Sequence, residues 1–444
     1  MNLHQPLPIT ENAASRTRLG LQRWRPALSH TVQAWLLTIV GICIATIAPA
    51  LLSLEGVGMH ESDMSGAFFT GASALVSIFL SLVILRNLLR FPMLRTSTYV
   101  AVTFVCCFGA VAAALKLSQN AFSTHQFFLS MVLMAGFFEG FLAAQRRWRP
   151  GRIIVVPGGQ PPAGLPRMLS RSMRLTFPST VPTAEIAYSG VVADLSAELG
   201  PEWERFLALS ALRGIPVHHV KQFNEMMTGQ VAMDHLWENT LGSSVPSLIY
   251  PQFKRALDLS IAVLLLPFIA LIVGVCAILI KRETPGPVFY RQARIGYGGR
   301  AFTIYKPRTM THVAATAHDQ PDYTLKEDPR ITQVGRWLRR YRIDELPQIV
   351  NVLRGEMSWI GPRPEAISLA QWYERDVAFY IYRHIVKPGI SGWAQVHQGN
   401  VAKVDAARRK LEYDFFYIKH FSFWLDVVIF VKTVRTILTG AGSR

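Results

Sequence analysis

The chain has 444 residues, of which 50% are hydrophobic and 17% charged, and its formal net charge is +17. This length allows two or three domains of roughly 100–200 residues each. A positive mean hydropathy beside so much charge excludes both an ordinary soluble protein and a bundle made of membrane helices alone. The basic excess indicates an anionic partner, and we expect no nucleic acid, because no nucleic-acid-binding motif accompanies the charge.

Four apolar segments precede residue 150, at about 33–54, 66–85, 97–115 and 125–144. Each is near the roughly 20 residues that cross a bilayer as a helix. Arginines gather before the first segment, between the second and third, and after the fourth: Arg16, Arg18, Arg23, Arg25, Arg86, Arg90, Arg95, Arg146, Arg147, Arg149 and Arg152. Because basic loops stay in the cytoplasm, residues 1–149 are predicted to form an α-helical transmembrane bundle with both ends there.

Residues 150–250 alternate between short strand and helix patterns. Strands are expected at 152–156, at 191–195 and after Gly214, and a helix over 201–213. This alternation predicts a small cytosolic α/β domain of Rossmann-like type. Gly158-Gly159 lacks the spacing and the acidic partner of a dinucleotide site, so a structural or oligomerisation role is expected, with a homodimer formed through this domain.

A fifth apolar run, at 256–280, differs from the first four in its flanks. Lys254 and Arg255 precede it, and Lys281 and Arg282 follow it, so both of its ends favour the cytoplasmic side. Pro267, near its middle, removes a backbone hydrogen bond and bends a helix. We predict a re-entrant helix that breaks at Pro267 and returns to the same face. The alternative is a fifth span with a kink.

Residues 251–444 are predicted to be a mainly α-helical catalytic domain, centred on the acidic pair Asp344-Glu345. Four arginines come just before this pair: Arg336, Arg339, Arg340 and Arg342. Guanidinium groups bind phosphate oxygens through paired hydrogen bonds. Two adjacent carboxylates repel each other, so a cation such as Mg²⁺ is expected beside them. Taken alone, however, the pair and the arginines are more typical of a solvated surface than of an active site.

Three blocks in this region carry a resemblance: Asp344-Glu-Leu-Pro-Gln348, Gly361-Pro-Arg-Pro364 and Lys387-Pro-Gly-Ile-Ser-Gly392. In this order they resemble the bacterial sugar transferase family, the monotopic polyprenyl-phosphate phosphoglycosyl transferases. The likeness covers about 253–440. Four preceding spans and an intervening α/β domain are similar to the long form of that family, whose members start exopolysaccharide, capsule or O-antigen synthesis.

The resemblance implies a role for each matching residue. Asp344 would attack the sugar-bearing phosphorus of a UDP-sugar and release UMP, and undecaprenyl phosphate would then take the sugar phosphate from the aspartyl intermediate. Glu345 would hold Mg²⁺ and deprotonate the acceptor. The implied phosphate-binding residues are Lys306, Arg308, Arg339 and Arg363.

The resemblance also places the protein in the bacterial inner membrane, among its lipids, with the active site on the cytoplasmic face. Glucose and galactose are the favoured sugars. The chain departs from the usual family block at Pro307 and Thr309, which are expected to alter a loop but not the reaction, and at Leu266 before the breaking proline. Two other functions stay open: a non-catalytic membrane scaffold or regulator, and a transporter, which the heavy cytosolic mass disfavours.

Overall fold

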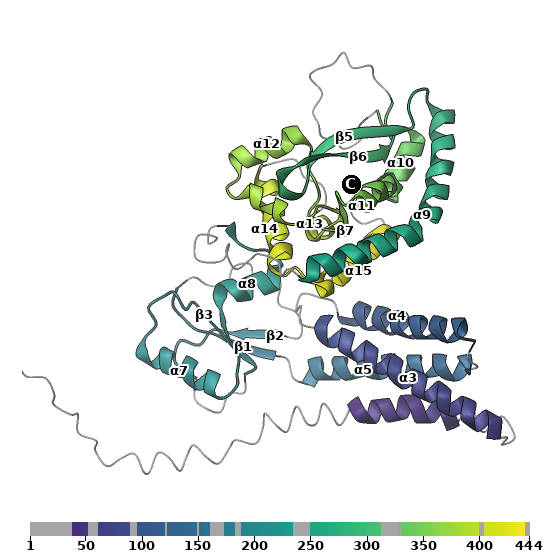
Figure 1. The fold of residues 1–444 in the computed structure, drawn as a ribbon. Coiled ribbons are helices and arrows are strands. Elements are labelled where there is room, and N and C mark those ends of the chain that lie inside the picture. Colours follow the sequence, from purple (N-terminus) through teal and green to yellow (C-terminus); the bar gives the residue numbers. More distant parts are fainter. Residues whose placement is uncertain are drawn as a thin grey trace, which may run out of the picture. The chain divides into compact units, whose positions relative to one another are not determined.

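A computed structural model describes residues 38–51, 61–88, 96–119, 122–148, 151–159, 173–182, 188–233, 249–311, 328, 330–398 and 404–439. The chain divides into two compact units, and each is described by itself. The first comprises Met1–Asn87 and Arg95–Pro150, and the second Leu88–Leu94 and Gly151–Arg444 (Figure 1). The arginines expected before the first helix, together with Arg90, Arg95 and Arg149, lie outside the described residues.

The first unit consists of apolar helices. They are Thr38–Leu51, α3 (Glu61–Leu88), α4 (Thr96–Leu117) and α5 (Thr124–Trp148). The last three contain segments long and apolar enough to cross a bilayer. Their inner sides share a core that includes Ile78, Phe104 and Met134, whereas Phe68 and Phe79 are 81% and 70% exposed. Outward apolar side chains suit lipid. The predicted four apolar N-terminal helices are confirmed, and the chain is a membrane protein.

The second unit begins with a four-stranded sheet in the order β2-β1-β3-β4, in which every pairing is parallel. Its strands are β1 (Gly151–Val155), β2 (Met173–Thr176), β3 (Gly190–Ala193) and β4 (Val217–His219). Two helices accompany it, α7 (Pro201–Leu212) and α8 (Val220–Thr228). Phe206 and Leu207 of α7 pack against Val191 of β3. This arrangement fits the expected alternation, and the Rossmann-like class stays a prediction.

The Gly158-Gly159 turn lies at the carboxyl end of β1, where it meets Asp194 at the end of β3. Both glycines have positive φ, and a Cβ at Gly159 would come within 2.6 Å of the Asp194 Cβ. The Asp194 carboxylate accepts hydrogen bonds from Ser196, and its Oδ1 lies 3.6 Å from Nε2 of His219. Close packing against Asp194 therefore explains the glycine without a bound phosphate.

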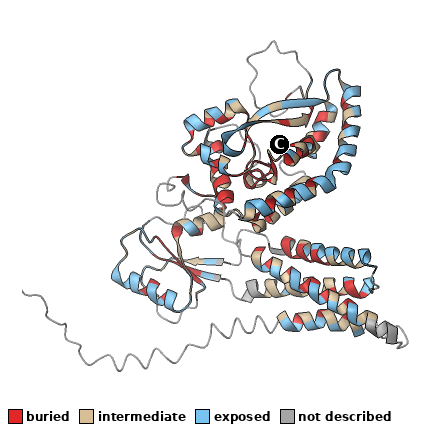
Figure 2. Cartoon of the chain, viewed as in Figure 1, coloured by how far each residue is buried: buried red, intermediate tan, exposed pale blue. Residues whose placement is uncertain are grey.

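The next element, α9 (Ile249–Glu283), is one continuous helix with Pro267 inside it. Figure 1 shows that it bends, and an internal proline is a known cause of such bends. The expected interruption is thus a bend within a helix. Ala262, Ile269 and Ile280 are buried on its inner face, whereas Leu264 and Leu271 are about 70% exposed (Figure 2). An outer surface of this kind suits lipid, and the re-entrant path stays a prediction.

The rest of the second unit is mostly helical, as predicted for the catalytic region. Its two small sheets are the hairpin of β5 (Phe289–Ile295) and β6 (Ala301–Pro307) and the parallel pair of β7 (Ser358–Ile360) and β8 (Gly389–Ser391). The helices are α10 (Gln333–Arg340), α11 (Ile349–Arg354), α12 (Ile367–Asp376), α13 (Trp393–Gln398), α14 (Val404–Lys419) and α15 (Phe423–Thr439). Short 3₁₀ helices are η2 (Tyr297–Gly299), η3 (Ile343–Gln348) and η4 (Tyr380–Ile385).

The last two helices, α14 and α15, are packed elements with buried inner faces. Phe416 and Tyr417 are nearly inaccessible, and so are Leu425 and Val428. Phe430, by contrast, is 61% exposed on α15. The aromatic residues of this stretch therefore belong mainly to the protein core, and only part of α15 offers an apolar outer face.

Candidate active site

The acidic pair Asp344-Glu345 lies on η3, directly after a strained residue. Arg342 has φ 55° and ψ 25°, a left-handed conformation that residues other than glycine rarely adopt. Such conformations persist where the surrounding structure holds them and are frequent at functional sites. Glu345 is buried and Asp344 is half-buried. The two adjacent carboxylates therefore have different surroundings.

Glu345 is held by arginines. Its Oε1 accepts a hydrogen bond of 2.7 Å from Nη1 of Arg363, and its Oε2 lies 3.8 Å from Nη1 of Arg342. Burial acts to raise the pKa of Glu345, but the positive charges of Arg363, Lys306 and Arg342 outweigh it and lower the pKa below its usual value. Glu345 is consequently a charged, fixed carboxylate.

Asp344 has no such partner. No described side chain forms a hydrogen bond or an ion pair with its carboxylate. Burial raises the pKa of Asp344 above the usual value, and the adjacent Glu345 adds to the rise. Three cations oppose it: Lys306, Arg363 and Arg339. Asp344 is thus the carboxylate of the pair that is available to a ligand.

Lys306 and Arg294 add positive charge from the β5-β6 hairpin. Lys306 pairs with Tyr290 in the strand register, and its ammonium group forms no ion pair with a described carboxylate. Burial, together with the charges of Arg363 and Arg294, lowers the pKa of Lys306 to about 8. Burial and Arg363 likewise lower the pKa of Arg294 to about 10. Crowded cations in a partly dry site favour the binding of an anion.

Arg339 reaches the site from α10, which packs tightly on the end of the hairpin. Its Nε donates a hydrogen bond of 2.9 Å to Oγ1 of Thr309. A Cβ at Gly335 would lie 2.7 Å from the carbonyl carbon of Thr309, so this close approach requires glycine. Thr309, one of the departures from the family block, therefore retains a hydroxyl that orients Arg339.

Arg363 belongs to a loop that two glycine-containing motifs build together. β7 and β8 pair in parallel, and Gly361 donates to the Ser391 carbonyl at 2.8 Å. Added Cβ atoms at Gly361 or Gly389 would collide with the opposing backbone. The Gly-Pro-Arg-Pro and Lys-Pro-Gly-Ile-Ser-Gly blocks are thus adjacent in space, and their packing fixes the position of the Arg363 backbone.

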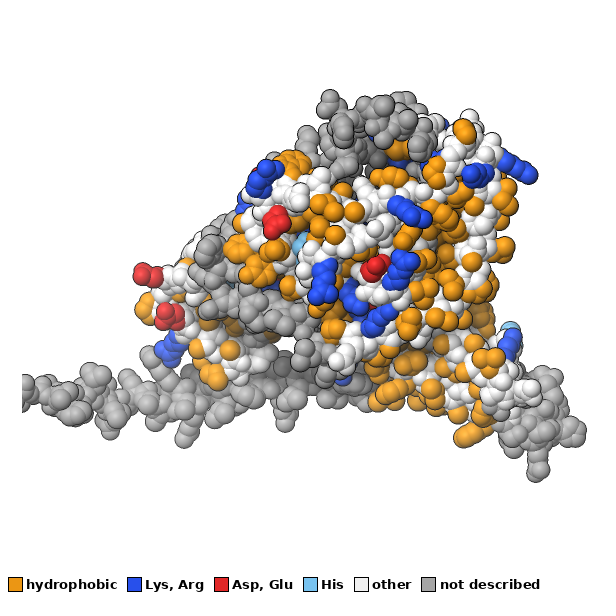
Figure 3. Space-filling model, turned by 45° about the horizontal axis from the view of Figure 1, so that its top comes forward, with side chains coloured by type: hydrophobic (Ala, Val, Ile, Leu, Met, Phe, Trp, Pro, Cys, Tyr) orange, Lys and Arg blue, Asp and Glu red, His pale blue; other side chains and the backbone are white. Residues whose placement is uncertain are grey.

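On the face drawn in Figure 3, Lys and Arg side chains gather around an acidic group, and hydrophobic side chains cover the side on which α9 lies. Five charged side chains lie close enough to shift one another's pKa and form one cluster: Asp344, Glu345, Lys306, Arg339 and Arg363. Such a site can bind a strongly anionic molecule and place an unpaired carboxylate against it.

Comparison with known proteins decides the family. The family described as "Bacterial sugar transferase" matches residues 249–440. A UDP-N-acetylgalactosamine-undecaprenyl-phosphate N-acetylgalactosaminephosphotransferase of Aeromonas hydrophila is 42% identical over 411 residues, which are 92% of this chain and 95% of that protein. The chain belongs to the bacterial sugar transferase family.

Other relatives match less than half of this sugar transferase. Two of them are named UDP-glucose:undecaprenyl-phosphate glucose-1-phosphate transferase. That of Caulobacter vibrioides is 40% identical over 202 residues, 45% of this chain and 74% of the relative. That of Escherichia coli is 39% identical over 184 residues, 41% of this chain and 39% of the relative.

Arg308, another residue assigned to the site from the sequence, directs its guanidinium toward the end of α9. Its guanidinium is buried and donates to the carbonyls of Pro285, at 2.8 Å, and Thr284, at 2.7 Å, just beyond α9. A further bond, of 2.9 Å, reaches the Thr284 hydroxyl. In this position Arg308 fastens the end of α9 to the catalytic body and does not join the cluster around Asp344.

Arg294 and Arg383 were not among the residues singled out from the sequence. Arg294 lies between two other arginines, Arg291 and Arg300, and nothing in the sequence distinguishes it from them. Arg383 lies before the Lys387 block and carried no signal of its own. Both contact the Arg363 loop through its backbone carbonyls. Only the fold shows these contacts.

The residues present fit a magnesium ion shared with substrate phosphates. Among the described residues there is no group of three or more His, Cys, Asp or Glu side chains that could hold a metal alone. Mg²⁺, however, commonly binds through one or two carboxylates and completes its shell with phosphate oxygens and water. The carboxylate of Asp344, which no described side chain binds, and Oε2 of Glu345, which accepts no hydrogen bond from a described side chain, offer such a pair of ligands.

Proposed function

We propose that this sugar transferase moves a hexose 1-phosphate from a UDP-sugar to undecaprenyl phosphate, giving undecaprenyl diphosphate sugar and UMP. The observation that carries the proposal is the unpaired Asp344 carboxylate, set beside Glu345 among Lys306, Arg339 and Arg363. The names of the relatives support the same reaction class. The reaction would be the first membrane step of exopolysaccharide, capsule or O-antigen synthesis.

In the proposed mechanism an oxygen of Asp344 attacks the sugar-bearing phosphorus. A carboxylate–phosphorus bond forms, the bond to the leaving phosphate breaks, and UMP departs with the electron pair. An oxygen of undecaprenyl phosphate then attacks the same phosphorus and restores the Asp344 carboxylate. Lys306 and Arg339 stabilise the negative charge that moves onto the departing phosphate.

Glu345 has a separate task in this scheme: it accepts the proton of the attacking undecaprenyl phosphate. Its bond to Arg363 fixes its position for that task. Asp344 and Glu345 would also hold Mg²⁺, which when bound neutralises part of the diphosphate charge. Because the two substrates react in turn with one carboxylate, ping-pong kinetics are expected.

The site is proposed to face the cytoplasm at the bacterial inner membrane, where the lipid phosphate is reached from the re-entrant α9. Both ends of α9 are fastened to the same body, which supports this path. Lys254 pairs with Asp426 at 2.5 Å near the first end, and Arg308 binds Thr284 beyond the second. A homodimer through the middle domain stays a prediction.

The sugar is proposed to be a hexose, with three candidates. Glucose and galactose are the candidates that the family resemblance favours, and the relatives from Caulobacter vibrioides and Escherichia coli carry glucose in their names. N-acetylgalactosamine joins them, because the relative that matches 92% of the chain is named for that sugar. No described side chain is assigned to the choice among them.

The test is UMP release by purified full-length enzyme, with undecaprenyl phosphate and a panel of UDP-glucose, UDP-galactose, UDP-N-acetylgalactosamine and UDP-N-acetylglucosamine. We expect Mg²⁺-dependent turnover with one or two of these sugars. Asp344→Asn should lower the rate about a thousandfold or more, since it removes the attacking group but keeps its shape.

The membrane scaffold is the competing function, and the same assay separates it from the enzyme. A folded wild-type chain that releases no UMP from any sugar in the panel would support the scaffold. Normal turnover by Asp344→Asn would leave the enzyme class standing but remove Asp344 as nucleophile.

A further inference from the structure

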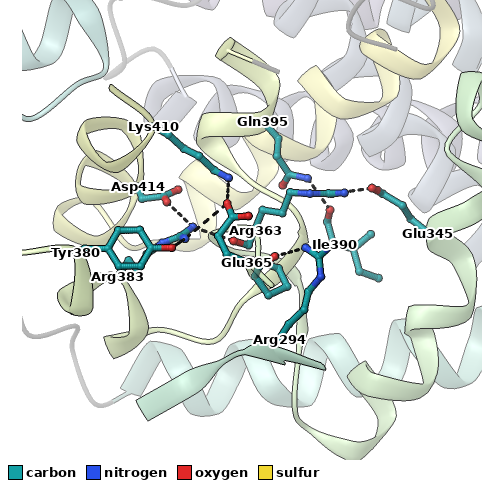
Figure 4. A network of polar contacts seen from close by, with 11 residues as sticks. Arg294, Glu345, Arg363, Glu365, Tyr380, Arg383, Ile390, Gln395, Lys410 and Asp414 are labelled. Atoms are coloured by element: carbon teal, nitrogen blue, oxygen red, sulfur yellow. Dashed lines mark hydrogen bonds and ion pairs between the residues drawn. The ribbon is translucent and has the colours of Figure 1, made fainter. Parts of the chain in front are cut away.

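A buried group of charged side chains lies behind the Arg363 loop, on the side away from Glu345 (Figure 4). Two successive carbonyls of this loop are held by guanidinium groups. The carbonyl of Arg363 accepts a hydrogen bond of 2.8 Å from Nη2 of Arg383, and the carbonyl of Pro364 accepts one from Nη1 of Arg294. The backbone of the loop is therefore held by hydrogen bonds at Arg363, the residue whose side chain binds Glu345.

Arg383 is itself held from several directions. Its Nη2 also donates to Oδ2 of Asp414 at 2.8 Å, and its Nη1 donates to the Tyr380 hydroxyl at 2.6 Å. Nη1 lies 3.8 Å from Oε1 of Glu365, which Lys410 also binds. Arg383 is 3% exposed and Asp414 is fully buried. Two cations, Arg383 and Lys410, thus face two carboxylates, Asp414 and Glu365, in a largely buried space.

Stability alone is a weak reason for such a group. Replacing a buried ion pair by hydrophobic residues of similar size is often neutral or stabilising, because charges are costly to remove from water. This group instead fixes the orientation of the Arg383 guanidinium. A planar guanidinium with fixed donors can bind Asp414, Tyr380 and one carbonyl only in a single orientation.

We propose that Arg383, oriented by Asp414 and Tyr380, is a positioning residue that presents the Arg363 guanidinium to Glu345. It touches neither carboxylate of the acidic pair and acts through the Arg363 backbone alone. α14 carries Asp414 and Lys410, so this helix supports the active site from behind. This positioning role of Arg383 rests on the proposed function in every experiment that measures sugar-phosphate transfer.

The gentlest test is a matched pair of tyrosines in the same cluster. Tyr380→Phe removes the hydroxyl that binds Arg383, whereas Tyr373→Phe removes a buried hydroxyl that has no hydrogen-bond partner among the described residues. We expect Tyr380→Phe to lower kcat about three- to tenfold, less than the full effect of one hydrogen bond to a charged group because Asp414 still holds Arg383, and Tyr373→Phe to leave kcat within about twofold. Equal effects of the two variants would contradict the proposal.

The stronger test is a double-mutant cycle between Asp414→Asn and Arg363→Gln. If Arg383 acts through Arg363, Asp414→Asn should lower kcat about tenfold in the wild-type chain and less than about twofold in the Arg363→Gln chain. A merely structural role would give losses that multiply. Thermal unfolding of each variant identifies any chain that is not folded, and for such a chain the tyrosine pair decides.

A structure of the Asp414→Asn enzyme provides a readout that does not depend on transfer. The proposal expects the Arg363 guanidinium to leave Glu345 or to occupy more than one position. An unchanged Arg363–Glu345 hydrogen bond would overturn it, whether or not the wild-type chain turns over a sugar. Absence of UMP release by the wild type would instead count against the proposed function.

Discussion

Lys306 is the cation of the site whose charge depends on pH in the range used for assays. With its pKa at about 8, Lys306 is charged below that pH and neutral above it. We predict that kcat/KM, which reports the free enzyme, falls as the pH rises through about 8. In Lys306→Arg the charge persists, so a pH titration of kcat/KM should show no such alkaline limb. The same limb in both proteins would rule out Lys306 as its source.

Arg308 is expected to matter for stability rather than for substrate binding. Its guanidinium holds the carbonyls just beyond α9, and Arg308→Gln would leave them without a donor. A loss of about 2 kcal/mol, or roughly 5 °C in the unfolding temperature, is expected, with KM for the UDP-sugar nearly unchanged in the folded fraction. The exposed Arg336, changed to Gln, is the control for loss of charge. A large rise in KM with an unchanged melting temperature would return Arg308 to the substrate site.

The contrast between Lys306 and Arg308 shows what the sequence could predict at this scale. The family resemblance implied that Lys306 and Arg308 both bind phosphate. β6, however, ends at Pro307, and Arg308 turns toward α9. Arg383 and Asp414 escaped detection for another reason. They are 31 positions apart in the sequence and lie in different helices. Their role depends on burial, which a local sequence pattern does not indicate.

At the scale of elements, charge and periodicity located the apolar helices and α7, because each such element has a regular pattern of its own. The sequence did not predict that the Gly-Pro-Arg-Pro and Lys-Pro-Gly-Ile-Ser-Gly blocks are neighbours. They are adjacent because β7 pairs with β8, and no periodicity in the sequence reveals that pairing. The bend of α9 was indicated by Pro267, but its continuity was not, since neighbouring elements decide whether a proline breaks a helix or bends it.

The contact between α10 and the hairpin yields a prediction about a single glycine. Gly335→Ala would push α10 away from the Thr309 carbonyl and carry Arg339 with it. We expect a lower unfolding temperature and at least a tenfold loss of transfer, about 1.4 kcal/mol or more of transition-state stabilisation. Gly274→Ala, in α9, meets nothing within 4 Å and should be neutral. Melting curves and UMP release of the two variants, compared side by side, test the contact.

At the scale of the whole molecule, the path of α9 determines on which side of the membrane the active site lies. Both ends of the helix are bound to the catalytic body, so a straight crossing would have to separate contacts that the fold holds together. The proposed transfer to a lipid phosphate also requires that body at the surface of one leaflet. The membrane topology of α9 therefore decides whether the proposed reaction can take place.

A single-cysteine experiment can answer it. In chains without the native cysteines, Arg282→Cys reports the second end of α9, and Ser118→Cys reports a loop that the charge pattern places in the periplasm. A maleimide that cannot cross membranes should label Ser118→Cys in intact spheroplasts, but Arg282→Cys only after permeabilisation. If α9 spanned the bilayer, Arg282→Cys would react in intact spheroplasts. That result would place the acidic pair on the periplasmic side, where cytoplasmic UDP-sugars do not reach it, and the proposed reaction would lose its substrate.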